Sequence, residues 1–307
     1  MELSPHPRDH LAHLSADQRQ ALAQVRTYAV EELGVTDTRY DEEYLLKFCV
    51  AKKFDVELSC KMFADFMDWR RQNKVDELVS LDITPLTRIL DIFPHNYYCV
   101  DREGNCVYIE KYKMFDLKEV MKVVGKEWLI NYFIYGYERL VNTILPHISK
   151  LAGRQIRHSI SILDLDGVNF SSVLAKRDEI NELTKIVSDI ANNYYPGITA
   201  KCIVLNTPMM FSIMWSVAKA FLSKETVQKT IILGISKSDA GSNYKKELFK
   251  LVSEDNLPTF LGGKNTTPLV VGMFEPLYKY DSITLGKLLS TTLSSSRTTK
   301  PSKEIQN

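Results

Sequence analysis

After about residue 97 the chain alternates short apolar runs with helical segments, and this alternation constrains the fold more than any other feature. The predicted strands are 106–110, 159–165, 201–206 and 229–235, and the predicted helices between them lie at about 116–150, 172–192 and 209–224. Strands joined by helices of this length pair in parallel, with right-handed crossovers. The sequence therefore predicts an α/β domain with a mostly parallel sheet over residues 79–275.

The regions on either side of this domain have a different character. Residues 1–78 are predicted to form an N-terminal helical subdomain, with a capping box at Ser15 and Gln18. Leu45, Phe48 and Cys49 show the helical spacing most clearly. Residues 276–307 form a C-terminal extension, which is polar and without periodicity from about residue 290 and is expected to be disordered there.

Charge and composition exclude several classes of function. The chain has 39 Lys and Arg against 38 Asp and Glu, a net charge of +1, so no basic field points to nucleic acid as a partner. No apolar run approaches the ~18 residues of a membrane span, and the polar N-terminus has no signal-peptide core, so we expect a cytoplasmic location. The 5 cysteines and 6 histidines show no metal-ligand spacing, so we expect neither a metal nor a cofactor.

The strand predicted at 159–165 is unusual because it places two hydroxyls on one face. Alternation sends Ser159, Ser161 and Leu163 to one side and Ile160 and Ile162 to the other. Parallel strands covered by helices on both faces are normally apolar throughout. Two interpretations remain open: the serines are buried and hydrogen-bonded, or this face lines a cavity. The strand at 106–110 has a tyrosine and a glutamate on one side, which favours the cavity if the two strands are neighbours.

The same strand continues into an enzyme-like motif. An apolar strand ending in D-x-D is typical of haloacid-dehalogenase-like phosphatases, where Asp164 and Asp166 would act as nucleophile and acid/base beside Mg²⁺. Thr207 and Lys229 fit two further roles, but the later strand is not followed by the acidic pair that holds the metal. The alternative is a strand-exit turn, in which an aspartate accepts backbone N–H groups.

The segment MMFSIMWSVAKAFL (209–222) is the most apolar helical stretch of the chain. Its helically spaced apolar residues are Phe211, Met214, Trp215, Ala218 and Phe221. A core helix is one interpretation, and the other is a movable lid that covers a ligand or touches a bilayer. Directly after it, Thr226 and Lys229 are three residues apart, and a hydroxyl beside an ammonium suits a phosphate.

Six segments, taken together and in order, resemble one known family. They are LLKFCVAKKFDVELSCKMF, DREGNCVYIEKY, SISILDLDG, NNYYPGITAKCIVLNTPMMF, TVQKTIILG and NLPTFLGG. On these motifs, about residues 40–263 resemble the CRAL-TRIO lipid-binding family, closest to its phosphatidylinositol/phosphatidylcholine transfer proteins. In the first segment, VAKKFD stands where the family has R-A-R-K-F-D.

The resemblance implies a carrier rather than an enzyme, with an apolar pocket that holds one phospholipid under a gating helix at 209–222. It implies exchange of phosphatidylinositol or phosphatidylcholine between membranes, and presentation of phosphatidylinositol to lipid kinases. It further implies a monomer in the cytoplasm that contacts membranes transiently, at the Golgi or endosomes. Leu163 and the apolar residues of 209–222 are expected to line the pocket and gate. A CRAL-TRIO carrier of a neutral hydrophobe, such as a tocopherol, retinoid or sterol, is the alternative within the family.

The resemblance also assigns headgroup residues. The positions that match the phosphatidylcholine site are Tyr97, Tyr108, Tyr137, Ser159 and Ser161, and those that match the phosphatidylinositol site are Lys52, Asp101, Thr226 and Lys229. Aromatic faces suit a quaternary ammonium. Two positions depart from the family pattern, because Lys52 replaces an arginine and Gly197 stands where a glutamate is expected. The preferred lipid is therefore left open by the sequence.

Overall fold

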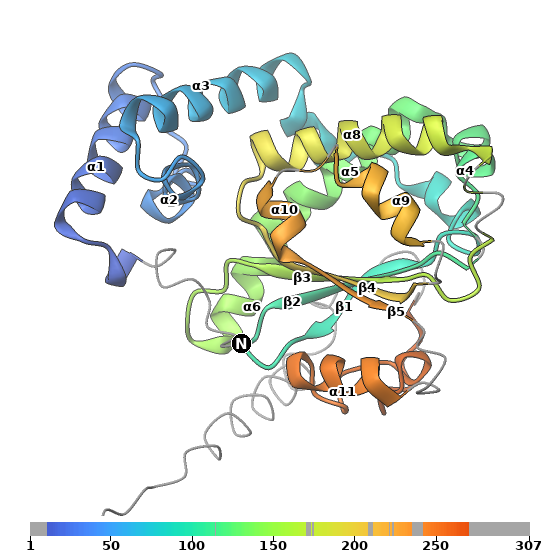
Figure 1. Ribbon diagram of the computed structural model, residues 1–307. Coiled ribbons are helices and arrows are strands. Elements are labelled where there is room, and N and C mark those ends of the chain that lie inside the picture. The colour runs from blue at the N-terminus through green and yellow to red at the C-terminus, as the bar shows by residue number, and fades with distance from the viewer. Residues whose placement is uncertain are drawn as a thin grey trace, which may run out of the picture.

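The computed structural model describes residues 11–113, 115–169, 173, 175–207, 211–220, 222, 224–234 and 242–269, and it confirms the predicted fold class. An N-terminal group of helices precedes an α/β domain built on one sheet (Figure 1). The C-terminal extension predicted at 276–307 lies outside the described residues. No helix within the described ranges combines the length and apolar character needed to cross a bilayer.

Three helices make up the N-terminal subdomain: α1 (Ala16–Glu31), α2 (Glu42–Ala51) and α3 (Val56–Gln72). The capping box is present, since the Ser15 side chain accepts from the Gln18 backbone and the Gln18 side chain accepts from the Ser15 backbone. Aspartates at the N-caps of α2 and α3 accept backbone N–H groups in the same way. A short 3₁₀ turn, η2 (Leu11–His13), precedes α1 at the start of the described chain. Two more, η3 (Val75–Ser80) and η4 (Thr84–Arg88), follow α3.

In the described part of the chain, the sheet has five strands in the order β1-β2-β3-β4-β5. They are β1 (His95–Val100), β2 (Cys106–Lys111), β3 (Ser159–Asp164), β4 (Thr199–Thr207) and β5 (Thr230–Gly234). β1 and β2 are antiparallel, and the other neighbours are parallel, as predicted. β1 is absent from the predicted strands because it is almost wholly buried and so lacks the alternation that identifies a one-sided strand.

The connections run through α4 (Leu117–Val124), α5 (Lys126–Arg139), η5 (Leu140–Ile144), α6 (Leu145–Ala152), α8 (Arg177–Tyr194), α9 (Phe211–Ala218) and α10 (Lys224–Lys229). The helix predicted at about 116–150 is therefore divided. Gly125 separates α4 from α5 with a φ of 78°, a conformation that glycine adopts without steric cost. η5 is a π-helical turn that leads into α6.

The two faces of the sheet have different surroundings. On one face, Ile160, Ile162, Ile203 and Leu205 are fully buried against residues after β5, including Leu248 of α11 (Ser242–Leu251). The opposite face turns toward α5, α8, α9 and α10, which lie above the sheet in Figure 1, whereas α11 lies below it. The last described element is η6 (Thr259–Leu261).

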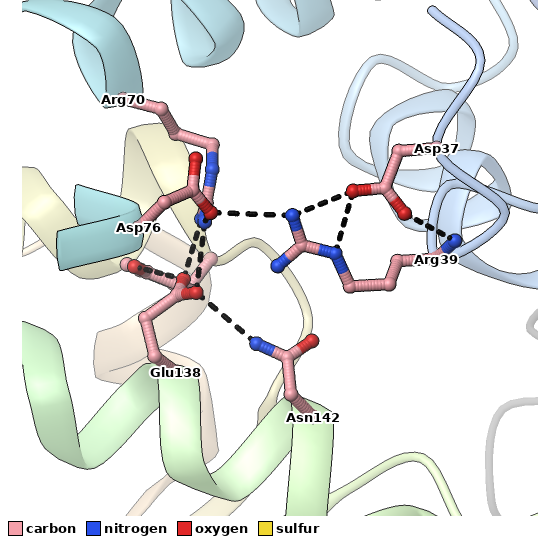
Figure 2. Close-up of polar contacts among 7 residues, drawn as sticks. Asp37, Arg39, Arg70, Asp76, Glu138 and Asn142 are labelled. Carbon is pink, nitrogen blue, oxygen red and sulfur yellow. Dashed lines mark hydrogen bonds and ion pairs between the residues drawn. The ribbon is translucent and has the colours of Figure 1, made fainter. Parts of the chain in front are cut away.

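A buried ion network fixes the N-terminal subdomain to the α/β domain (Figure 2). Arg70 of α3 is only 3% exposed and donates two hydrogen bonds to Glu138 of α5, at 2.6 and 3.0 Å. Tyr195 also donates to Glu138, at 2.6 Å. Arg70 reaches Asp76 as well, and through Asp76 the network continues to Arg39 at 3.2 Å. The two units are thus joined by a charge-assisted pair, Arg70 with Glu138, that is largely withdrawn from solvent.

Two further contacts hold the same interface. The Trp69 ring stacks on Tyr194 of α8, with ring centroids 4.1 Å apart and planes 8° apart. Glu43 of α2 forms an ion pair with Arg157, which lies just before β3. Aromatic stacking and this part-buried ion pair together give the subdomain a defined orientation against the α/β domain.

Candidate functional site: a cavity above the sheet

A cavity of about 1250 Å³ lies between the sheet and the helices that cover it. Its wall is formed by the upper face of the sheet, by α5, α8, α9 and α10, and by α2 of the N-terminal subdomain. Cavities that hold drug-sized ligands are commonly roughly 300–1,000 Å³. This cavity is large enough for a bigger, chain-like molecule.

The floor of the cavity comes from alternate residues of neighbouring strands. Ser159, Ser161 and Leu163 of β3 line it, whereas Ile160 and Ile162 face α11. β2 and β3 are paired in parallel, so Tyr108 lies beside Ser161 in the sheet. The period of two therefore gives β3 one apolar face for the core and one mixed face for the cavity.

Tyrosines gather at this polar part of the floor. The rings of Tyr97 and Tyr108 are 4.9 Å apart, and Tyr137 stacks on Tyr195 at 4.9 Å. Burial raises the pKa of Tyr97 and of Tyr108 well above 10, and that of Tyr137 to about 12. All three hydroxyls are therefore neutral at physiological pH and can donate hydrogen bonds. The structure brings together the five residues that match the phosphatidylcholine site.

Glu110 adds a carboxyl group to this aromatic cluster. It is 7% exposed, and its carboxylate accepts a hydrogen bond from the Tyr112 hydroxyl. Burial raises the pKa of Glu110, and hydrogen bonds from Tyr112 and Tyr108 partly offset that effect. Within the described part of the chain it forms no ion pair, so it is a buried acid surrounded by neutral aromatic donors.

The end of the cavity next to α2 is basic. Lys47, Lys52 and Lys53 line it. Lys53 and Phe54 follow the end of α2 with φ values of 56° and 64°, so two successive side-chain-bearing residues are left-handed. Such backbone strain is maintained only when surrounding contacts require it, and it is concentrated at functional sites. The strained turn places two adjacent lysines at the cavity.

α10 contributes a hydroxyl and an ammonium to the same cavity. Thr226 and Lys229 both line it, and Thr226 donates to the Asn192 side chain at 3.3 Å. Lys229 forms an ion pair with Glu225 one turn earlier, at 2.5 Å. Gly197 lies at the cavity with a φ of 74°, and its carbonyl contacts the His158 ring at 2.7 Å.

Asp101 does not lie at the cavity. Its buried carboxylate accepts from the backbone N–H groups of Glu103 and Asn105, both at 2.8 Å, and from the Asn105 side chain at 2.9 Å. These contacts shape the turn between β1 and β2. Burial raises the pKa of Asp101 to about 6. Of the four positions that match the phosphatidylinositol site, the structure thus brings Lys52, Thr226 and Lys229 to the cavity.

The segment expected to gate the cavity forms α9, and two of its aromatic residues line the cavity. Phe211 and Trp215 have stacked rings, 6.3 Å between centroids. The side chains of Met214 and Ala218, and Phe221 as a whole, lie outside the described residues. An apolar side of α9 therefore closes part of the cavity.

The D-x-D motif forms a strand-exit turn. Asp164 accepts from the Asn206 side chain at 2.7 Å and from the backbone N–H of Asp166 at 3.1 Å. Asp166 is exposed. No cluster of three or more metal-ligating side chains is found in the described ranges. The Asp164 carboxylate thus has the local hydrogen bonds of a strand-exit turn, the interpretation that the sequence left open beside the enzyme motif.

Glu110 and Lys47 line the cavity but were not among the site residues predicted from the sequence. Glu110 had a detectable signal, because alternation places it on the same side of its strand as Tyr108. Lys47 had none, since a lone lysine in an apolar helix looks the same whether it faces solvent or a cavity.

Comparisons with known proteins show the family of this chain. The family model described as the CRAL/TRIO domain matches residues 92–263. The Sec14 cytosolic factor of Schizosaccharomyces pombe is 33% identical over 263 residues, covering 85% of this chain and 87% of that protein. The phosphatidylinositol/phosphatidylcholine transfer protein SFH12 of Arabidopsis thaliana is 29% identical over 255 residues, covering 82% of this chain and 45% of that protein.

A solved structure shows the same fold. The crystal structure of Sfh5 matches with a TM-score of 0.64 at 16% identity, covering 92% of this chain and 98% of that one. At that identity the likeness concerns the fold alone. Since the family model covers more than half of the chain and the Sec14 cytosolic factor aligns with most of it, this chain belongs to the CRAL/TRIO family.

Proposed function

We propose that this protein is a non-enzymatic phospholipid carrier, which takes one phosphatidylinositol or one phosphatidylcholine from a membrane and delivers it to another. The observation that carries the proposal is the cavity of about 1250 Å³, which has apolar walls and two separate polar regions. A cavity for a phospholipid needs apolar walls for the acyl chains and a few placed polar groups for the headgroup. Relatives named as phosphatidylinositol/phosphatidylcholine transfer proteins support the choice of cargo.

Phosphatidylcholine is proposed to place its headgroup against the sheet floor. Tyr97 and Tyr108 offer two aromatic faces to the quaternary ammonium, and the neighbouring Ser161 offers a hydroxyl to the phosphate. The buried Glu110 carboxyl lies beside the same tyrosines, and its negative form would complement a fixed positive charge.

Phosphatidylinositol is proposed to place its headgroup at the basic end, where its phosphodiester would meet Lys52, Thr226 and Lys229. Glu225, which forms an ion pair with Lys229, offers a carboxylate that can accept from inositol hydroxyls. The family pattern has a glutamate at the position of Gly197. We propose that Glu225 supplies the carboxylate acceptor that this glutamate would otherwise provide.

Exchange is proposed to require that α9 moves away from the cavity at a membrane surface. Phe211 and Trp215 would then replace contacts inside the cavity by contacts with the bilayer. A transient association with Golgi or endosomal membranes, a monomeric state and presentation of phosphatidylinositol to lipid kinases belong to the same proposal. A cargo without a phosphate is less well matched, because it would leave the lysines at the cavity without an anion.

Native mass spectrometry of protein purified from cells should find one bound phospholipid per chain. A vesicle transfer assay should show that Lys229→Ala reduces phosphatidylinositol transfer more than phosphatidylcholine transfer, and that Tyr97→Leu has the reverse preference. The loss of a desolvated cation–π contact of about 2 kcal/mol corresponds to more than a tenfold loss of phosphatidylcholine affinity. A wild-type protein that binds and moves neither lipid would refute the proposal.

A further inference from the structure

The cavity carries more positive charge than phosphatidylinositol or phosphatidylcholine requires. Six cations line it (Lys47, Lys52, Lys53, Arg139, Arg157 and Lys229), against three carboxylates (Glu43, Glu110 and Glu225). Two of the carboxylates form ion pairs with two of the cations, Glu43 with Arg157 and Glu225 with Lys229. The formal excess is thus about three positive charges, whereas the phosphodiester of phosphatidylinositol supplies one negative charge.

Lys47 is the member of this group with the most unusual surroundings. It lies on α2 one helical turn after Glu43 and one turn before Ala51, and all three line the cavity. Its ammonium lies 4.6 Å from the centre of the Tyr44 ring. Among the described residues it has no ion-pair partner, and burial lowers its pKa to about 8. A part-buried ammonium without a carboxylate partner is stabilised when an anion binds to it.

Lys52 and Lys53 extend the same basic surface from the end of α2. Neither forms an ion pair within the part of the chain that the structure describes, and the turn that carries them is held in the left-handed backbone conformation noted above. Three lysines without carboxylate partners among the described residues therefore share the end of the cavity next to α2. Lysine ammonium groups are strong point charges for phosphate oxygens.

We propose that Lys47, together with Lys52 and Lys53, binds a phosphate monoester on the inositol ring, so that the cavity accepts a phosphorylated phosphatidylinositol as well as phosphatidylinositol. This inference rests on the proposed carrier function and extends it to a third cargo. A phosphate monoester carries about 1.5–2 negative charges at pH 7. With the phosphodiester it would neutralise nearly all of the excess positive charge.

The lipid is the ligand to which the proposal commits. A soluble inositol phosphate has the same headgroup chemistry, but it would leave the apolar wall formed by residues such as Leu163 and Trp215 in contact with water. The acyl chains of the lipid would cover that wall, so the lipid should bind far more tightly than its isolated headgroup.

The test uses the full-length protein and vesicles of phosphatidylcholine that contain equal mole fractions of phosphatidylinositol and phosphatidylinositol 4-phosphate. Native mass spectrometry after equilibration gives the ratio of the two inositol lipids bound. Lys47→Gln should lower the ratio of phosphorylated to unphosphorylated lipid about tenfold, the effect of losing a charge-assisted hydrogen bond. Lys47→Arg, which keeps the charge, should retain most of the ratio.

Lys61→Gln is the matched control, because Lys61 lies on α3, is 69% exposed and pairs with Asp65 at the surface. It should leave the ratio unchanged. Calorimetry with inositol 1,4-bisphosphate, on the protein after delipidation, provides the arm for the isolated headgroup. Weak or no binding of this compound, with clear uptake of the phosphorylated lipid, is expected.

Three outcomes would overturn the inference. Wild-type protein that loads phosphatidylinositol but never phosphatidylinositol 4-phosphate would overturn it and leave the carrier function intact. The same holds if Lys47→Gln lowers both inositol lipids equally, or if the soluble bisphosphate binds without uptake of the lipid. Wild-type protein that loads no phospholipid would instead refute the carrier function itself.

Discussion

Removal of the Arg70 guanidinium should destabilise the protein by several kcal/mol. In Arg70→Met, Glu138 loses two hydrogen bonds and its counter-charge, although it is only 12% exposed. Breaking a buried pair by removing one partner costs roughly 3–5 kcal/mol. Tyr195 and Asn142 still donate to Glu138, so we expect the lower end, about 3 kcal/mol. The contact from Arg70 to Asp76 adds little, because Asp76 is 62% exposed.

Urea unfolding followed by far-UV circular dichroism would measure this loss for Arg70→Met, Glu138→Gln and the double variant. The double variant should be less destabilised than the sum of the singles by about 2 kcal/mol, since neither partner is then left alone. Arg71→Met is the control on the same helix, where the arginine is 73% exposed, and it should cost less than about 0.5 kcal/mol. Equal effects of Arg70→Met and Arg71→Met, or strict additivity in the double variant, would show that the network does not hold the interface.

Three further predictions concern the cavity. In Gly197→Glu, the new Cβ has room, but the side chain is forced onto a φ of 74°, so the free energy of unfolding should fall by about 1–2 kcal/mol. Native mass spectrometry of this variant should find more bound phosphatidylinositol relative to phosphatidylcholine. An unchanged lipid ratio would contradict the role given to this position. Lys47→Met should raise the melting temperature at pH 7, and its advantage should shrink as pH rises from about 8 to 10, because the unfolded wild type binds more protons in that window. The neighbouring Tyr44 remains neutral there, because burial raises its pKa well above 10. Glu110→Gln should have the opposite pH dependence. Wild-type stability falls as pH rises above the ordinary pKa of glutamate, because the folded state keeps the proton to a higher pH than the unfolded state, so the advantage of the variant should grow from pH 4 toward pH 7. Calorimetric scans that show a constant difference in stability across this range would contradict the prediction.

Much of the cavity floor could be predicted from the sequence of β3. This strand lies between β2 and β4, and its side chains alternate strictly between the two faces of the sheet. Ser159 and Ser161 were identified in this way, and the position of Ser161 beside Tyr108 follows from the pairing of β2 with β3. The same reasoning could not find β1, whose residues are buried on both faces. Nor could it separate α4 from α5, since the break depends on the backbone angle of Gly125.

The basic end of the cavity was less predictable for a different reason. It is assembled from α2, α10 and the segment before β3, which are distant in the sequence, so only tertiary structure brings their charges together. Asp101 illustrates the converse, because the family resemblance identified it as a headgroup residue, whereas its carboxylate lies in the β1–β2 turn and accepts three local hydrogen bonds there. Local hydrogen bonding decided its position.

The unequal surroundings of the two sheet faces have a consequence for the empty state of a carrier. The side chains packed against α11 form a continuous apolar layer that includes Ile162, Leu205 and Leu248, and none of them borders the cavity. Emptying or filling the cavity therefore leaves that layer intact. A molecule built in this way can survive the interval between donor and acceptor membranes, because the contacts that hold α11 to the sheet are separate from those that line the cavity.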